Sequence, residues 1–252
     1  MRRNGSGDIL YGGGHEYADM QVEVTYAHGD RWLGPKPKAA VQALPETFAK
    51  LSAGKPLTVA LFGDSISTGC NSSKAMNTAP QLPGYGERLV AMLESASGSQ
   101  VVFHNLSVGG MTSTWGVQNS KGVADRKPDL CILAWGMNDQ NAPGLAPAAF
   151  AGNLKQQMAS VKAANPKAEF ILVSGMLPNE EWQLVIPGRL AAYREAMRSL
   201  CTNGVALADV TGVWEQLLKR KTYLDITGNG VNHPNDFGHD LYAQVIGALL
   251  LK

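Results

Sequence analysis

Short apolar runs alternate with longer segments of helical periodicity from Leu57 to the end of the chain. Five short runs are mainly apolar, which is typical of strands buried on both faces; they cover residues 58–62, 101–106, 130–135, 169–174 and 205–210. The segments between them predict helices over residues 86–94, 117–126, 147–164, 189–201, 213–220 and 236–251. Strands joined through helices need crossover connections and hence a parallel sheet. We expect an α/β fold, a three-layer doubly wound sheet of about five parallel strands.

The first 55 residues show a different pattern. Residues 1–20 are rich in glycine and carry no periodicity, so we expect a poorly ordered tail there. Residues 21–28 alternate apolar with polar positions, which predicts a half-buried strand, and residues 45–51 form a short helical stretch behind a proline-rich linker. The expected organisation is a tail, orphan strand and linker over residues 1–55 as an N-terminal appendage, then one main domain over residues 56–252.

Composition narrows the class of protein. The 252 residues are 44% hydrophobic and 17% charged, a composition that excludes a disordered chain. The net charge of +1 speaks against a nucleic-acid-binding protein, because phosphate binding requires an excess of positive charge. No apolar run approaches the ~18 to 20 residues that span a bilayer, and no apolar segment follows Arg2 as in a signal peptide. The spacing of Cys70, Cys131 and Cys201 excludes a disulfide scaffold and a cysteine zinc site. A soluble protein without nucleic-acid or membrane partners is expected; compartment and oligomeric state stay open.

Residues able to carry chemistry follow the predicted strands, where ligands bind in parallel sheets. Ser65 lies in a sharp turn after the first strand, where a base can reach its hydroxyl. Gly110 follows the second strand, Asn138 follows the third, and His233 precedes the last helix. Each one alone has an ordinary interpretation: a turn for the serine and for the glycine, a helix cap for the asparagine, and an incidental loop residue for the histidine.

Together and in this order, these pieces resemble the SGNH hydrolases, also called the GDSL esterase and lipase family. The sequence GDS at 63–65, the glycine block GGMT at 109–112, GMND at 136–139 and His233 before a proline match its four blocks, and the likeness spans about residues 57–251. The resemblance implies a flavodoxin-like domain in which Ser65 attacks an ester and His233 is the base. The Ser65 and Gly110 N–H groups and the Asn138 amide would form the oxyanion hole. It implies no cofactor or metal, and favours short acyl esters, with O-acetylated carbohydrate as the natural candidate.

One position departs from the family pattern. Its last block usually reads Asp-x-x-His, but Gly230 stands three residues before His233. We therefore expect a Ser65–His233 dyad, or a histidine oriented by a backbone carbonyl or by the Asn229 side chain. The nearby carboxylates carry no motif that points to this role, and the one at 236 stands where helix capping is common.

Two other classes of function remain open at this point. The same sheet occurs in flavin-binding electron carriers, and residues 67–72 faintly resemble a phosphate-binding loop. Such a loop leads directly into a helix, whereas about fifteen residues separate Cys70 from the next predicted helix. A catalytically inactive SGNH binding module is the other alternative, and the intact serine, glycine, asparagine and histidine argue against it.

The remaining histidines are expected to be non-catalytic; they are His15, His28, His104 and His239. Trp115 and residues 176–182 follow strand ends and are expected to help wall the substrate pocket.

Overall fold

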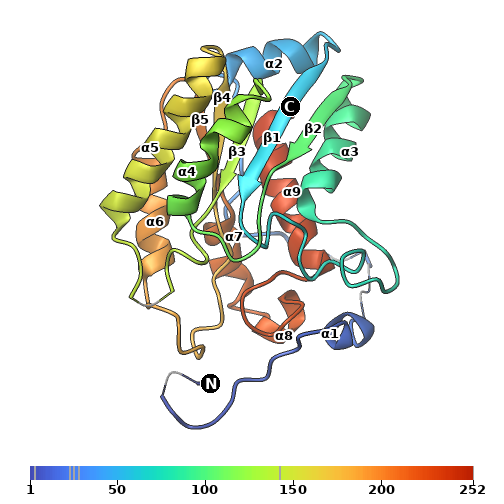
Figure 1. Cartoon of the computed structure of the whole chain (residues 1–252). Coiled ribbons are helices and arrows are strands. Elements are labelled where there is room, and N and C mark those ends of the chain that lie inside the picture. The colour runs from blue at the N-terminus through green and yellow to red at the C-terminus, as the bar shows by residue number, and fades with distance from the viewer. Residues whose placement is uncertain (3, 23, 25, 28, 142, 252) are drawn as a thin grey trace.

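A parallel sheet forms the centre of the computed structural model, which describes all residues except 3, 23, 25, 28, 142 and 252 (Figure 1). Within the described residues the sheet has five strands in the order β2-β1-β3-β4-β5. Their bounds are β1 Leu57–Gly63, β2 Val101–Asn105, β3 Leu130–Ala134, β4 Glu169–Ser174 and β5 Val205–Asp209. This order is that of a doubly wound sheet whose switch point lies between β1 and β3. The predicted fold class is confirmed.

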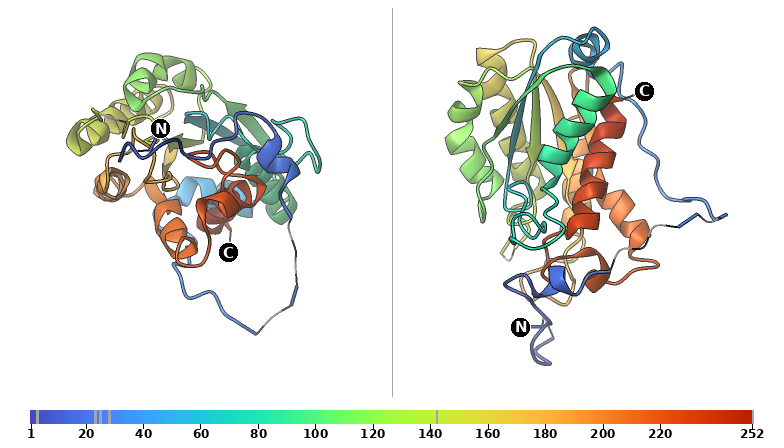
Figure 2. Two further views of the ribbon diagram at one scale, coloured as in Figure 1. Left: turned by 90° about the horizontal axis from the view of Figure 1, so that it is seen from below. Right: turned by 90° about the vertical axis from the view of Figure 1, so that its right-hand side faces the viewer.

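Helices cover both faces of the sheet, which Figure 2 (right) shows nearly edge-on. One face carries α3 (Tyr85–Ser97) and α9 (Asp236–Leu250), and the other carries α4 (Ser113–Ala124), α5 (Pro147–Ala164) and α6 (Arg189–Arg198). The helix α7 (Val210–Leu217) follows β5 directly. Two short helices, α1 (Glu16–Asp19) and α8 (Tyr223–Ile226), lie beyond the carboxyl ends of the strands (Figure 1). In the part of the chain that the structure describes, no helix is long and apolar enough to cross a membrane.

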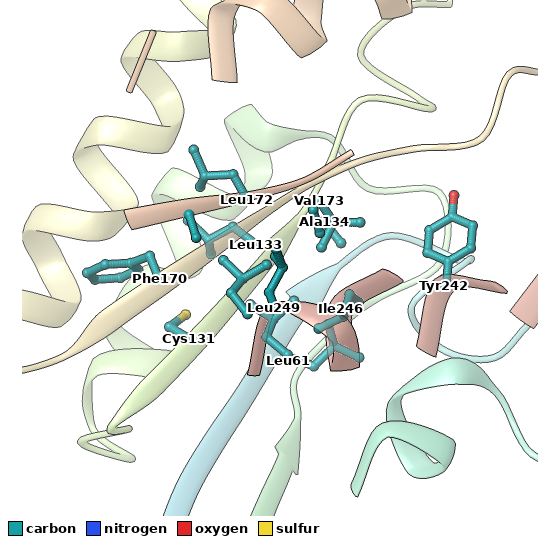
Figure 3. Close-up of a cluster of buried hydrophobic side chains, with 14 of the residues drawn as sticks. Leu61, Cys131, Leu133, Ala134, Phe170, Leu172, Val173, Tyr242, Ile246 and Leu249 are labelled. Carbon is teal, nitrogen blue, oxygen red and sulfur yellow. The ribbon is translucent and has the colours of Figure 1, made fainter. Parts of the chain in front are cut away.

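The apolar runs are buried because both faces of the sheet are covered. Leu61, Leu133 and Leu172 of three neighbouring strands and Ile246 of α9 belong to one cluster of buried hydrophobic side chains (Figure 3), and all are at most 1% exposed. β2 is the exception, since Val102 is 42% exposed. The expectation that this strand is buried on both faces is wrong, because β2 is an edge strand packed mainly on α3.

Several helix bounds differ from the expected ones because side-chain caps decide where a helix begins. The Thr112 side chain accepts a hydrogen bond from Trp115 N, so α4 begins four residues earlier than expected. Asp209 caps α7 through Gly212 N (2.8 Å), so this helix begins at residue 210 instead of 213. α6 ends at residue 198, three residues early, and α8 was not expected. α3 runs on to residue 97 and ends at Gly98, whose φ of 69° suits a C-terminal glycine.

The N-terminal appendage differs most from expectation. The described residues of segment 21–28 form no strand, and Val22, Val24 and Tyr26 are 87%, 70% and 71% exposed, because the chain here runs away from the sheet (Figure 2). Positions 23, 25 and 28, and with them His28, lie outside the described residues. The poorly ordered tail is also wrong for residues 9–19. Gly12 N donates to Asn229 O (3.2 Å), and Tyr17 is only 8% exposed.

The linker and the helix α2 (Pro45–Ser52) join this appendage to the main unit. Leu44, Phe48 and Leu51 are 0%, 6% and 4% exposed and belong to the central core cluster. The expected short helix at 45–51 is confirmed, and its apolar stripe explains why it docks on the sheet.

We expect Phe48→Ala to lower the free energy of unfolding by about 3 to 5 kcal/mol, because it removes a buried aromatic side chain and leaves a cavity. Leu33→Ala is the control, since Leu33 is 93% exposed, and should change stability by less than about 0.5 kcal/mol. Urea unfolding followed by circular dichroism measures both. Equal stabilities for the two variants would contradict the packing of α2.

Candidate active site

Ser65 lies two residues beyond β1, at the switch point of the sheet. β1 pairs with β3 so that Gly63 lies opposite Ala134. The turn after the strand closes on itself, because Ser67 N and Thr68 N donate to Asp64 O at 3.1 and 3.2 Å. This turn leaves Ser65 partly exposed at the carboxyl edge of the sheet.

Two buried carboxyl groups fix the loops around this turn. Asp64 is 2% exposed and accepts from Ile66 N (3.0 Å) and from the Met137 backbone, which ties the end of β1 to the end of β3. Burial, together with the charge of Asp139, raises the pKa of Asp64 to about 7. Asp139 in turn accepts from Ser113 N (2.9 Å) at the start of α4, and burial raises its pKa too. These two groups hold the serine, glycine and asparagine loops together, a role that the sequence analysis did not assign.

His233 reaches Ser65 from a closed loop between α8 and α9. The loop is bridged at its base by the Thr227–Pro234 pairing, and Gly228 N donates to His233 O (3.0 Å). His233 Nε2 lies 2.8 Å from Ser65 Oγ. Burial lowers the pKa of His233 to about 4, so the ring is neutral at pH 7 and able to accept the serine proton.

Gly110 and Asn138 share one cavity of about 580 Å³ with the serine and the histidine. Asn138 Nδ2 donates to Met111 O (2.9 Å), which aligns the amide; its two N–H groups leave a second donor beyond this bond. Gly110 has a φ of 77°, a left-handed conformation that favours glycine. The structure thus places all four predicted site residues around the same cavity.

The rest of the cavity wall comes from segments far apart in the sequence. Trp182 lines it, as expected for the segment after β4, whereas Trp115 does not. Trp115 packs instead on Phe62, with ring centroids 5.8 Å apart. The N-terminal appendage contributes Asp8, Ile9 and Tyr11, which the sequence analysis missed because residues 1–20 carry no periodic or motif signal. The described histidines expected to be non-catalytic, His15, His104 and His239, do not line this cavity.

The nearby carboxylates are engaged elsewhere. The Asp225 carboxylate accepts from Thr222 N (2.6 Å) in a capping box of α8. Asp236 accepts from Ser73 N (3.0 Å) and pairs with Arg88 (3.1 Å). It is not the N-cap of α9, because Asn235 holds that place. Neither carboxylate is a partner of His233.

A hydroxyl hydrogen-bonded to a partly buried histidine, at the carboxyl edge of a doubly wound sheet, is an arrangement that serine hydrolases use. The model of the GDSL-like lipase/acylhydrolase family matches residues 61–241. The chain therefore belongs to the GDSL-like lipase/acylhydrolase family, a class of carboxylic ester hydrolases. This membership speaks against a flavin-binding electron carrier, as do the turns over residues 64–77 where a phosphate loop would lead into a helix.

Solved structures share the fold at low sequence identity. A two-domain esterase active on acetylated mannans has a TM-score of 0.62 at 21% identity, over 85% of this chain and 54% of that chain. A carbohydrate esterase family 3 protein from Talaromyces cellulolyticus has a TM-score of 0.59 at 19% identity, over 76% of this chain and 94% of that chain. An acetyl xylan esterase variant from Geobacillus stearothermophilus has a TM-score of 0.59 at 16% identity, over 77% of this chain and 94% of that chain. The chain spans about half the length of the first. No curated protein matches the sequence.

We expect Asp225→Ala and Asp236→Ala each to lower kcat by less than about a hundredfold, against roughly ten-thousandfold for loss of a true triad aspartate. The reason is that both carboxylates hold backbone or arginine groups and not the imidazole. Steady-state kinetics on an aryl acetate measures the effect, with circular dichroism to check folding. A loss as large as that of His233→Ala at either position would show that this carboxylate serves the histidine.

Proposed function

We propose that the protein is a serine esterase that hydrolyses short-chain acyl esters through an acyl-enzyme on Ser65, with O-acetyl groups on carbohydrate as its substrates. The observation that carries this proposal is the 2.8 Å contact between Ser65 Oγ and His233 Nε2 inside a cavity that Gly110 and Asn138 also line. The low pKa of the partly buried His233 supports the same assignment, because only the neutral ring can act as the base.

In the acylation step, Ser65 Oγ attacks the ester carbonyl carbon while His233 Nε2 takes the hydroxyl proton. The carbonyl oxygen becomes an oxyanion, which the Ser65 and Gly110 N–H groups and the Asn138 amide stabilise. When the carbon–oxygen bond to the alcohol breaks, His233 returns the proton to the leaving alcohol. The acyl group stays on Ser65.

Deacylation repeats these roles with water as the nucleophile. His233 takes a proton from the water as it attacks the acyl carbon, and then protonates Ser65 Oγ as the carboxylic acid leaves. Every step uses side chains and backbone groups of this chain. The proton moves only between the serine, the histidine, the water and the leaving alcohol.

The cavity and its surroundings support the proposed substrate class. The loop over residues 70–83 is rich in Asn, Ser, Thr and Pro and has no apolar run that could act as a lipid lid. The cavity of about 580 Å³ has polar and aromatic groups on its wall, among them Asp8, Tyr11 and Trp182, which line it together with Ser65. Esterases active on acetylated mannans and acetyl xylan share the fold, which supports an acetylated carbohydrate over a long-chain lipid.

We expect Ser65→Ala to abolish ester hydrolysis without changing the melting temperature, because the partly exposed hydroxyl contributes to chemistry and little to packing. A panel of p-nitrophenyl esters from acetate to palmitate, followed by acetylated manno- and xylo-oligosaccharides, measures activity. Ser52→Ala, on the exposed side of α2, is the matched control and should retain full activity.

Activity in this panel should fall once the acyl chain exceeds about four to six carbons, because the loop over residues 70–83 offers no apolar lid to bury a longer chain. Each methylene gains only about 0.8 kcal/mol even where a groove buries it.

Retention of more than a tenth of the wild-type rate by Ser65→Ala would show that Ser65 is not the nucleophile. A wild-type protein inactive on every ester would favour the inactive binding module, and faster turnover of palmitate than of acetate would make it a lipase.

Asn138→Ala should lower kcat by about 10²- to 10³-fold with little change in KM, because the amide acts on charge that develops only in the transition state. The measurement is the kcat and KM of the best ester from the panel. A loss of less than about fivefold in kcat would remove Asn138 from the oxyanion hole.

A further inference from the structure

The second ring nitrogen of His233 faces a residue that the family pattern does not use. His233 Nδ1 lies 2.8 Å from Asn71 Oδ1. The other end of this amide donates from Nδ2 to Gly228 O (3.0 Å). This second bond fixes the orientation of the amide, because a flipped amide would turn its oxygen toward the Gly228 carbonyl and its NH₂ toward the ring. Asn71 therefore presents an acceptor to Nδ1–H.

Asn229, which the sequence analysis considered for this role, is used differently. Its Oδ1 accepts from the backbone N–H groups of the three residues that follow Gly230, at 2.9, 3.0 and 3.2 Å. Its Nδ2 lies 3.2 Å from His233 Nδ1 and donates to Asn232 Oδ1 (2.9 Å). Asn229 thus shapes the loop and offers no acceptor to the ring.

The usual position of the aspartate is closed in this chain. Gly230 has a φ of 77°, and a Cβ added there would lie 2.5 Å from Leu10 O and 3.0 Å from the Tyr17 hydroxyl. The N-terminal appendage therefore fills the space into which a side chain at 230 would extend. A side-chain acceptor for the histidine therefore cannot extend from position 230.

Asn71 is held in place from three sides. It has a φ of 64° and is 6% exposed, in the turn that begins at Ser65, where Cys70 N donates to Ser65 O (3.1 Å). The buried His239 of α9 donates from Nε2 to Cys70 O (3.0 Å). A Cβ at Gly228 would lie 2.6 Å from Asn71 Cβ, so this close approach requires glycine. Nucleophile and acceptor thus belong to one short turn.

We infer that Asn71 is the positioning residue of the active site: its neutral amide oxygen holds His233 in the Nδ1–H tautomer, in place of the family's carboxylate. This inference rests on the proposed function of Ser65 and His233. An amide oxygen fixes the ring and its tautomer as a carboxylate does, but it adds no negative charge to stabilise the imidazolium.

The missing charge has a consequence for pH dependence. No carboxylate among the described partners of the ring opposes burial, which keeps the pKa of His233 near 4. The titratable and charged groups on the elements packed around the ring include Asp8, Tyr11 and Tyr17 of the appendage and Asp64 and Cys70 of the serine turn. They also include His239 and Asp236 of α9, with Arg88 of α3 paired to Asp236. The base form of the enzyme should persist into mildly acidic solution.

The test compares substitutions at Asn71 with the same substitutions at Asn77. Asn77 lies in the same loop, has a φ of 54° and is exposed, so glycine or aspartate there changes the same kind of backbone site without touching the histidine. Asn71→Gly should lower kcat by about a hundredfold at pH 7 with KM nearly unchanged, because the imidazole loses its orientation. Asn77→Gly should retain wild-type kcat.

Asn71→Asp tests the role through the pKa of His233, which would not change if Asn71 were merely structural. A carboxylate beside Nδ1 favours the imidazolium, so the pKa of His233 and the acid limb of kcat/KM should move up by about 1 to 3 units. The variant should therefore be less active at pH 5 than the wild type, relative to pH 8. Asn77→Asp should leave the acid limb in place.

NMR titration of the histidine ring signals, with His233 assigned from the His233→Asn variant, measures the same pKa without any need for activity. Equal kcat and equal pH profiles for the Asn71 and Asn77 variants, with no shift of the His233 pKa, would overturn the inference. Should Asn71→Gly fail to fold, the nearly isosteric Asn71→Asp decides by its titration. An upward shift in a protein whose activity survives Ser65→Ala would refute the proposed function and leave the hydrogen bond to Asn71 established.

Discussion

The pairing of β1 with β3 is the constraint on which the whole site depends. These strands diverge into crossovers on opposite faces of the sheet, so the loops that leave them, carrying Ser65 and Asn138, are not covered by a helix of the sheet layers. The buried Asp64 then joins the two loops through backbone N–H groups of both. The pairing of two apolar strands thereby fixes the distance between the Ser65 hydroxyl and the Asn138 amide.

The histidine has to be brought to this edge by a separate device, because it follows the last strand by more than twenty residues. The loop over residues 227–234 is closed at its base and shaped inside by the Asn229 side chain. Asn71 reaches it from the serine turn, and the N-terminal appendage packs on its outer side through Leu10, Gly12 and Tyr17. Serine turn, histidine loop and appendage form one interlocked structure, in which glycines at 228 and 230 allow the close approaches.

The sequence predicted those features that depend on local pattern. Apolar runs indicated the five strands, and Ser65, Gly110, Asn138 and His233 were singled out because each stands in a short block of the family pattern. Asn71 gave no such signal: an asparagine among turn residues looks like any left-handed turn former, and its contact joins residues 162 positions apart. In the appendage a local pattern was present but misleading. The alternation at 21–28 predicted a strand that the described residues do not form, whereas the glycine-rich segment before it, which has no periodicity, contacts the histidine loop.

The central claim is that one serine, activated by one histidine, is the nucleophile. Labelling with a fluorophosphonate tests it most directly, since this reagent forms a covalent bond only with an activated hydroxyl. The structure predicts a single adduct, located on Ser65 by mass spectrometry, that forms in step with the loss of esterase activity and does not form in His233→Ala. Full activity with Ser65 unlabelled, or an adduct on another residue that accounts for the inactivation, would contradict the account.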